Sequence, residues 1–228
     1  MSSAPPAFKY IDRKKDKLIA LIPGWASDQR IFSVLNLEFN YLMPLNFSPF
    51  NFEQALLKTL KKNKLKKISL FGWSLGGFLA ARLAAKYGNL FDQVILVSVR
   101  KRYCREDLDQ IRKQLSKNKK GFLYKFYLQC FSKPAEMSWF KQNLLKDYCQ
   151  ELDLNYLLEG LDYLECARID SRLLNKVNRI KIIHGQDDRI APVAEAREIK
   201  NGLNDASFIS VPGSGHMPFL KQGFSRLI

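Results

Sequence analysis

Residues 66–88 read KKISLFGWSLGGFLAARLAAKYG. The apolar run from Ile68 to Phe71 predicts a buried strand, and the small and apolar residues after Gly76 predict a helix. Glycines at 72, 76 and 77 surround the point where the strand pattern changes to the helix pattern. The segment therefore predicts a strand, a tight turn and a helix in direct succession.

The same alternation extends in both directions along the chain. Apolar runs lie at residues 18–24, 41–45, 94–99 and 179–188 and in ASFISV at 206–211, with helical patterns at 52–60 and 192–203. This alternation is typical of an α/β fold with a mostly parallel sheet and helices on both faces. No convincing strand pattern lies between 100 and 178, so we expect a helical lid there. The predicted domains are a core of residues 1–99 and 179–228, and a lid of residues 100–178 inserted in it.

The turn inside the opening segment has the spacing of a nucleophile elbow. Gly72-Trp73-Ser74-Leu75-Gly76 matches Gly-x-Ser-x-Gly in a strand-turn-helix context. The sharp turn leaves no room for bulky residues two positions from the serine, which accounts for both glycines. Ser74 is therefore the candidate nucleophile; the alternative is a glycine-rich turn without chemistry.

A serine hydroxyl needs a base, and the sequence has two histidines. In proteins with this elbow, the chain order is serine, acid, histidine, with the histidine in the last loop. His216 in GSGHMP fits that order, whereas His184 in IIHG fits a structural histidine at a strand end. The acid is expected after the strand at 179–185, where Asp187 and Asp188 stand side by side. Asp188, three residues after Gly185, is preferred, partly on the family pattern given below.

Acyl transfer also needs two backbone N–H groups for the developing oxyanion. Leu75, directly after the serine, is the first candidate donor. The second is Trp25, in the loop Pro23-Gly24-Trp25 after the first apolar run. The alternative for Trp25 is an ordinary surface aromatic on a loop.

Three passages carry a family resemblance: LIPGWASDQRIFSVL at 21–35, LFGWSLGGFLAARLA at 70–84 and GSGHMPF at 213–219. Over nearly the whole chain the sequence resembles the α/β-hydrolase superfamily, and within it the pimeloyl-[acyl-carrier-protein] methyl ester esterases of biotin synthesis. Pro23 departs from that pattern, where a histidine often precedes Gly-Trp. The short N-terminal part leaves open whether one or both opening antiparallel strands are present.

The resemblance implies an α/β-hydrolase fold with a helical lid and a serine carboxylesterase that uses no metal or other cofactor. Its substrate would be a methyl-esterified dicarboxylic acyl chain on an acyl-carrier protein. The alternatives are a small-molecule carboxylesterase, a thioesterase or a lactonase on the same triad, and a non-catalytic binding protein on a hydrolase scaffold.

The charge of the chain suits an acidic partner. Its 37 Lys and Arg against 22 Asp and Glu give a formal net charge of +15. The first part of the lid is rich in basic residues, and arginine recognises phosphate better than lysine does. The candidate contacts to the carrier protein are therefore its four arginines: Arg100, Arg102, Arg105 and Arg112. The alternative is a solvated basic surface. Phe122 and Phe126 are candidates for an apolar acyl channel, with ordinary lid packing as the alternative.

Other features bear on partners and location. No nucleic-acid motif and no long apolar run is present, so we expect neither nucleic-acid nor membrane binding. We expect a monomer in the cytoplasm. The four cysteines have neither CxxC spacing nor a nearby histidine, so we expect no zinc site. Without a secretory signal, reduced thiols packed as small hydrophobes are favoured over two disulfides.

Overall fold

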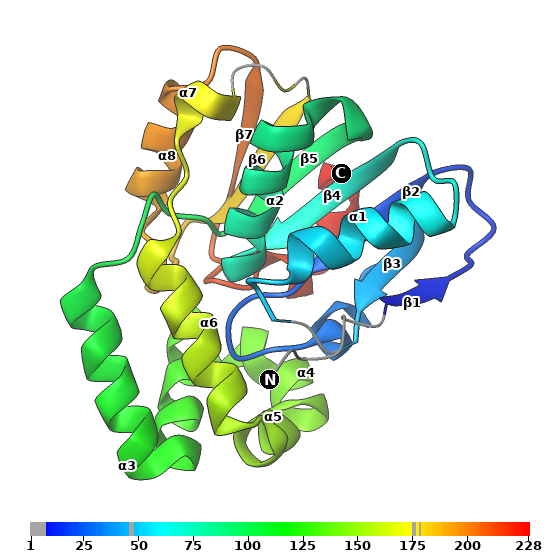
Figure 1. Cartoon of the computed structure of the whole chain (residues 1–228). Helices are drawn as coiled ribbons and strands as arrows, with labels where there is room; N and C mark the ends of the chain where they lie inside the picture. Colours follow the sequence, from blue (N-terminus) through cyan, green and yellow to red (C-terminus); the bar gives the residue numbers. More distant parts are fainter. Residues whose placement is uncertain (1–7, 46–47, 175–176, 178) are drawn as a thin grey trace.

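The structure, a computed structural model, describes residues 8–45, 48–174, 177 and 179–228. Within these residues, seven strands form one sheet in the order β1-β3-β2-β4-β5-β6-β7 (Figure 1). The strands are β1 (Phe8–Ile11), β2 (Leu18–Ile22), β3 (Asn40–Pro44), β4 (Ile68–Trp73), β5 (Phe91–Val97), β6 (Ile180–Gly185) and β7 (Ala206–Val211). Every pairing that the structure describes is parallel except that of β1 with β3.

This architecture confirms the predicted α/β-hydrolase fold with a mostly parallel sheet. Each apolar run of the sequence became a strand, with bounds that differ by up to three residues. One opening antiparallel strand, β1, is present among the described residues, which begin at residue 8. No clear sequence pattern marks β1, because two of its four residues are exposed.

α-Helices pack on one face of the sheet and short 3-10 helices on the other, as the two sides of β4 show. Helices α1 (Phe52–Lys62) and α2 (Leu75–Tyr87) lie in front of the sheet in Figure 1. The side of β4 at Gly72 faces α2, because a Cβ built on Gly72 would lie 2.8 Å from the Ala80 Cβ. Phe71 packs instead against Phe219 and Phe224 of the C-terminal 3-10 turns, with ring centroids 6.2 Å apart in both pairs.

Between β5 and β6 the described residues form helices and no strand. These are α3 (Arg105–Gln129), α4 (Ser138–Asn143), α5 (Leu145–Glu151), α6 (Leu154–Cys166) and α7 (Ser171–Leu174). Helix α3 is broken at Asn118, whose φ of −157° and ψ of 80° are not helical. In Figure 1, α3 to α6 gather at the end of the sheet toward which the parallel strands point. The last helix, α8 (Val193–Asn201), packs on β6 and β7.

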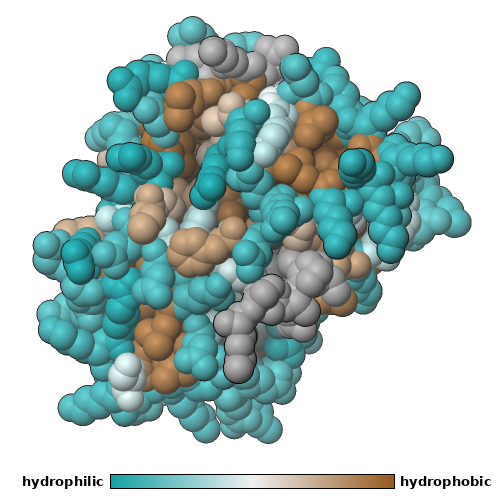
Figure 2. All heavy atoms as spheres, viewed as in Figure 1, coloured by the Kyte–Doolittle hydropathy of each residue, from teal (hydrophilic) through white to brown (hydrophobic). Residues whose placement is uncertain are grey.

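The face of the molecule drawn in Figure 2 is largely hydrophilic. Hydrophobic patches interrupt this face. None of the described helices has both the length and the apolar content to span a bilayer.

All four cysteines are free: Cys130 and Cys149 are buried, but Cys104 and Cys166 are exposed. The expectation that all four pack as small hydrophobes is therefore wrong for Cys104 and Cys166, which lie where the helical segment begins and where α6 ends.

The close packing around the elbow glycine Gly76 gives a testable prediction for the stability of the fold. A Cβ on Gly76 would lie 2.2 Å from the Ile22 carbonyl oxygen, so Gly76→Ala forces backbone apart. We expect it to lower the free energy of unfolding by about 3 kcal/mol in urea titrations. Gly223→Ala is the matched control, because a Cβ there meets nothing within 4 Å and only its φ of +82° is unfavourable. It should cost about 1 kcal/mol. Equal losses would contradict this account.

Candidate active site

Ser74 occupies the turn between β4 and α2 in strained backbone geometry. Its φ of 53° and ψ of −115° lie in a region that residues with a side chain rarely adopt. The Ser74 N–H donates to the Val97 carbonyl at 2.9 Å, and the Gly77 N–H donates to the Ser74 carbonyl at 2.8 Å. These bonds hold the turn so that the serine side chain stands at the carboxyl edge of the sheet.

His216 reaches Ser74 from the loop after β7. Its Nε2 lies 2.9 Å from Ser74 Oγ, and its Nδ1 lies 2.7 Å from Asp188 Oδ2. The backbone fixes the ring from two sides. The His216 N–H donates to the Cys130 carbonyl at 2.7 Å, and the indole N–H of Trp73 donates to the His216 carbonyl at 2.8 Å. The structure thus joins the predicted serine, histidine and acid in one hydrogen-bonded row.

The structure distinguishes the two adjacent aspartates. Asp188 Oδ1 accepts the backbone N–H groups of Ile190 and Ala191 at 2.8 and 2.9 Å, which leaves Oδ2 free to face His216. Asp187 is exposed; its backbone N–H donates to the Ser214 carbonyl at 2.9 Å, and its carboxylate has no partner among the described residues. Asp188, not Asp187, is therefore the carboxylate beside the histidine.

Charge and hydrogen bonds keep Asp188 ionised. Burial by itself would raise its pKa, but the positive charge of His216 and hydrogen bonds from His184 and His216 hold the pKa well below its usual range. His184 is fully buried, and its Nε2 lies 2.7 Å from the Ala191 carbonyl and 3.3 Å from Asp188 Oδ2. A carbonyl only accepts, so Nε2 carries the proton. His184 supports the acid and does not contact Ser74 in any described interaction.

The two expected oxyanion donors flank the serine. Leu75 is the first residue of α2, where backbone N–H groups lack partners within the helix. The loop of Trp25 packs directly on the elbow, because a Cβ on Gly24 would lie 3.1 Å from the Ser74 Cβ. The Trp25 side chain is buried, and its indole N–H donates to the Leu157 carbonyl at 2.8 Å, so it is not a surface aromatic.

The predicted acyl-channel residues lie beside that loop. The Phe126 ring meets Trp25 edge-on with centroids 4.9 Å apart, and the Phe122 centroid is 6.4 Å from Trp25. Phe122 and Phe126 stack on each other at 6.4 Å. Both are partly buried against the core.

The four arginines of the predicted carrier-binding cluster differ in how free they are. Arg100 pairs with Glu195 at 2.6 Å, and Arg105 with Glu165 at 3.2 Å. Arg112 is enclosed by three carboxylates: Asp109, Asp162 and Glu165. Arg102 is exposed and forms no ion pair with any residue that the structure describes. A cavity of about 660 Å³ brings three of the four together, lined by Arg100, Arg102 and Arg105 among others.

Tyr103 also lines this cavity and is a site residue that sequence reasoning missed. Burial raises its pKa to about 12, against the opposing effects of the Arg100 charge and a hydrogen bond with the Ser74 side chain. The Arg100 guanidinium stands 4.7 Å from the centre of its ring. No motif marks Tyr103, because it lies among basic residues in an irregular segment. Its side chain therefore lies near both Arg100 of the cavity lining and the Ser74 side chain.

Within the described residues, no three His, Cys, Asp or Glu side chains gather as a metal site would require.

Comparison with known proteins agrees with this geometry. A family model described as alpha/beta hydrolase fold matches residues 27–179. Two similar relatives are pimeloyl-[acyl-carrier protein] methyl ester esterases. That of Nitrosomonas europaea is 27% identical over 68% of this chain, and that of Wigglesworthia glossinidia brevipalpis is 31% identical over 70%. The match spans 66% of the length of each relative.

A solved structure, an esterase from Exiguobacterium antarcticum, superposes with a TM-score of 0.83. It covers 97% of this chain and 94% of that one at 15% identity, which speaks for the fold alone. The family match covers well over half of the sequence, and the fold is the one it describes. The chain therefore belongs to the alpha/beta hydrolase fold family.

Proposed function

We propose that this chain is a serine carboxylesterase that hydrolyses the methyl ester of a pimeloyl chain held on an acyl-carrier protein. The observation that carries the proposal is the hydrogen-bonded row of Ser74, His216 and Asp188, with 2.9 and 2.7 Å between successive side chains. This row has the contacts that a nucleophile, a general base and an orienting acid require.

The proposed mechanism follows from these contacts. Ser74 Oγ attacks the ester carbonyl while His216 Nε2 takes its proton, and Asp188 stabilises the imidazolium that forms. The N–H groups of Trp25 and Leu75 stabilise the oxyanion. His216 then gives this proton to the departing methoxide, which leaves as methanol while the acyl chain stays on Ser74 Oγ. Water, activated by the same histidine, releases the free carboxylate and restores Ser74.

The proposed carrier partner rests on charge and on the relatives. Carrier proteins are typically acidic, and the lining of the cavity beside Tyr103 includes the exposed Arg102 and Arg105, although four glutamates line it too. Both relatives compared above are named for action on a carrier-linked ester. Arg102 is the strongest candidate contact because it is exposed and unpaired among the described residues.

A second candidate function is hydrolysis of small esters or thioesters. The observation that favours it is that Arg100 and Arg112 already have carboxylate partners within the chain. Paired arginines are less available to an acidic protein, and the triad itself does not choose between these substrates.

One experiment separates these functions. Methyl-pimeloyl carrier protein is incubated with the parent chain and with Ser74→Ala, and the carrier is followed by mass spectrometry. Loss of only the methyl group, absent with Ser74→Ala, supports the proposal. Release of the whole acyl chain indicates a thioesterase. Cleavage of p-nitrophenyl butyrate but not of the carrier substrate would leave the small-ester function.

The carrier contact gives a further prediction. Arg102→Glu is expected to lower kcat/KM for methyl-pimeloyl carrier protein about tenfold at low salt, because it replaces an attractive charge with a repulsive one. Hydrolysis of p-nitrophenyl butyrate should not change. Lys61→Glu, an exposed charge reversal in the last turn of α1, is the matched control. An equal loss with both variants would show only a dependence on net charge.

A further inference from the structure

The loop that carries the proposed oxyanion donor Trp25 needs external support. Ala26 has a φ of 56°, which a residue with a Cβ adopts only when its surroundings hold it there. Ala26 and Ser27 are fully buried, so their carbonyl groups must find donors inside the protein.

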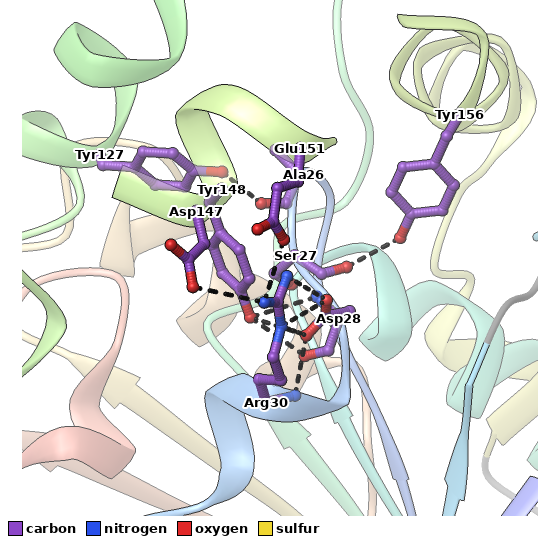
Figure 3. Close-up of polar contacts among 9 residues, drawn as sticks. All are labelled: Ala26, Ser27, Asp28, Arg30, Tyr127, Asp147, Tyr148, Glu151 and Tyr156. Atoms are coloured by element: carbon purple, nitrogen blue, oxygen red, sulfur yellow. Dashed lines mark hydrogen bonds and ion pairs between the residues drawn. The ribbon is translucent and has the colours of Figure 1, made fainter. Parts of the chain in front are cut away.

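Three tyrosine hydroxyls from three helices bind this loop (Figure 3). Tyr127 of α3 donates to the Ala26 carbonyl at 2.5 Å, and Tyr156 of α6 donates to the Ser27 carbonyl at 2.8 Å. Tyr148 of α5 lies 3.0 Å from Asp28 Oδ1. These contacts join residues more than 100 positions apart, and each falls on a successive residue of the loop.

The three hydroxyls are held as donors. Burial raises the pKa of Tyr127, Tyr148 and Tyr156, so all three stay protonated at neutral pH. Arg30 reinforces the Asp28 contact: it pairs with Asp28 at 2.9 Å and stands 5.2 Å from the centre of the Tyr148 ring. Arg30 also pairs with Asp147 at 3.6 Å and with Glu151 at 3.2 Å (Figure 3).

Ser27 links the contact from Tyr156 of α6 to the Trp25 backbone N–H, which is the proposed oxyanion donor. Its Oγ donates to the Gly24 carbonyl at 2.9 Å. That carbonyl belongs to the same planar peptide as the Trp25 N–H, so fixing one end of the peptide fixes the direction of the other. The Trp25 indole is held independently, by the Leu157 carbonyl at 2.8 Å and by close packing against Gly160 of α6.

We propose that Tyr156 and Ser27 are positioning residues that aim the Trp25 N–H at the oxyanion, with Tyr127 and Tyr148 holding the rest of the loop. This inference rests on the proposed function, and it assigns the helical segment a task besides covering the site. The helices hold one half of the oxyanion-binding arrangement, so their interior face is part of the catalytic support.

The test compares Tyr156→Phe, Ser27→Ala and the double variant with Tyr163→Phe. Tyr163 is the matched control, because it is a buried tyrosine on the same helix whose electrostatic contact is with Arg82 instead of the loop. The readouts are kcat and KM for p-nitrophenyl butyrate, the rate of Ser74 labelling by a fluorophosphonate, and the melting temperature.

Each single variant is expected to lower kcat and the labelling rate about tenfold, with KM within twofold, since removal of a whole oxyanion donor costs about 100-fold or more. The double variant should lose less than the product of the two, because both act on one peptide. Tyr163→Phe should keep the parent rates.

The outcomes separate this inference from the function beneath it. A parent chain that the fluorophosphonate does not label would overturn the proposed function and the positioning role together. A labelled, active parent whose Tyr156→Phe and Ser27→Ala variants match Tyr163→Phe would overturn the positioning role alone. The positioning role is also overturned if kcat falls only in step with the melting temperature, in the control as well.

Discussion

Replacing Ser74 with alanine is expected to lower kcat for ester hydrolysis by about 10⁶-fold, close to the background rate. The reason is that Ser74 Oγ is the only group within 2.9 Å of His216 Nε2 in the described contacts, so no other side chain can take over the attack. The measurement is release of p-nitrophenol from p-nitrophenyl butyrate by both chains at equal concentration.

Ser98 offers a matched control for that substitution. It follows the neighbouring strand β5, is buried, and has a positive φ of 51°, much as Ser74 does after β4. Its hydroxyl has no hydrogen-bond partner among the described residues. Ser98→Ala should therefore keep nearly the full rate. Comparable losses in both variants would mean that serine removal harms the fold rather than the chemistry.

Replacing Asp188 with asparagine is expected to lower kcat about 10⁴-fold. The amide cannot stabilise an imidazolium, and hydrogen bonding to His216 Nδ1 then favours the wrong tautomer. Asp187→Asn is the matched control, since it changes the adjacent, exposed carboxylate. The comparison is again kcat for p-nitrophenyl butyrate, and a greater loss with Asp187→Asn would contradict the assignment of the acid.

The lowered pKa of Asp188 also predicts how the free energy of unfolding depends on pH. A carboxylate whose folded pKa lies below its unfolded value of about 3.9 stabilises the fold above that pH, and the contribution is lost as the pH falls through the folded pKa. The unfolding free energies of the parent and Asp188→Asn should therefore differ most near neutral pH, and the difference should be smaller at pH 3, which lies below the unfolded pKa. Urea titrations of the parent and of Asp188→Asn at pH 7 and pH 3 measure this difference.

Much of the site could be predicted because its signals are local. The elbow requires glycines within two residues of Ser74, and the order of elements along the chain identified His216 from two histidines. The choice between Asp187 and Asp188 depended on where the backbone turns, and the bonds from Ile190 and Ala191 to Asp188 Oδ1 decide it.

The rest of the site lies beyond such reasoning because it is made of long-range contacts. Tyr127, Tyr148 and Tyr156 belong to helical patterns in which an inward tyrosine looks like any core residue. Only the packing of three helices against one loop gives their hydroxyls a common target. Tyr103 likewise lies 29 residues from Ser74 in the chain, in a segment without a motif.

The arginine cluster also shows a limit of prediction from sequence. Composition suggested four arginines facing a partner, yet Arg112 is surrounded by acids of α3 and α6. The sequence shows how many charges of each sign a segment carries. It does not show which of them the fold pairs internally, and this leaves Arg102 as the best candidate for a carrier contact.

The central claim is that Ser74 is a nucleophile activated by His216. The most direct test is incubation of the parent chain and of His216→Ala with a fluorophosphonate, followed by peptide mapping by mass spectrometry. We predict one adduct per parent chain, on the peptide that contains Ser74, and almost none on His216→Ala. No adduct on the parent, or equal labelling of both chains, would contradict the claim and favour a non-catalytic binding protein on a hydrolase fold.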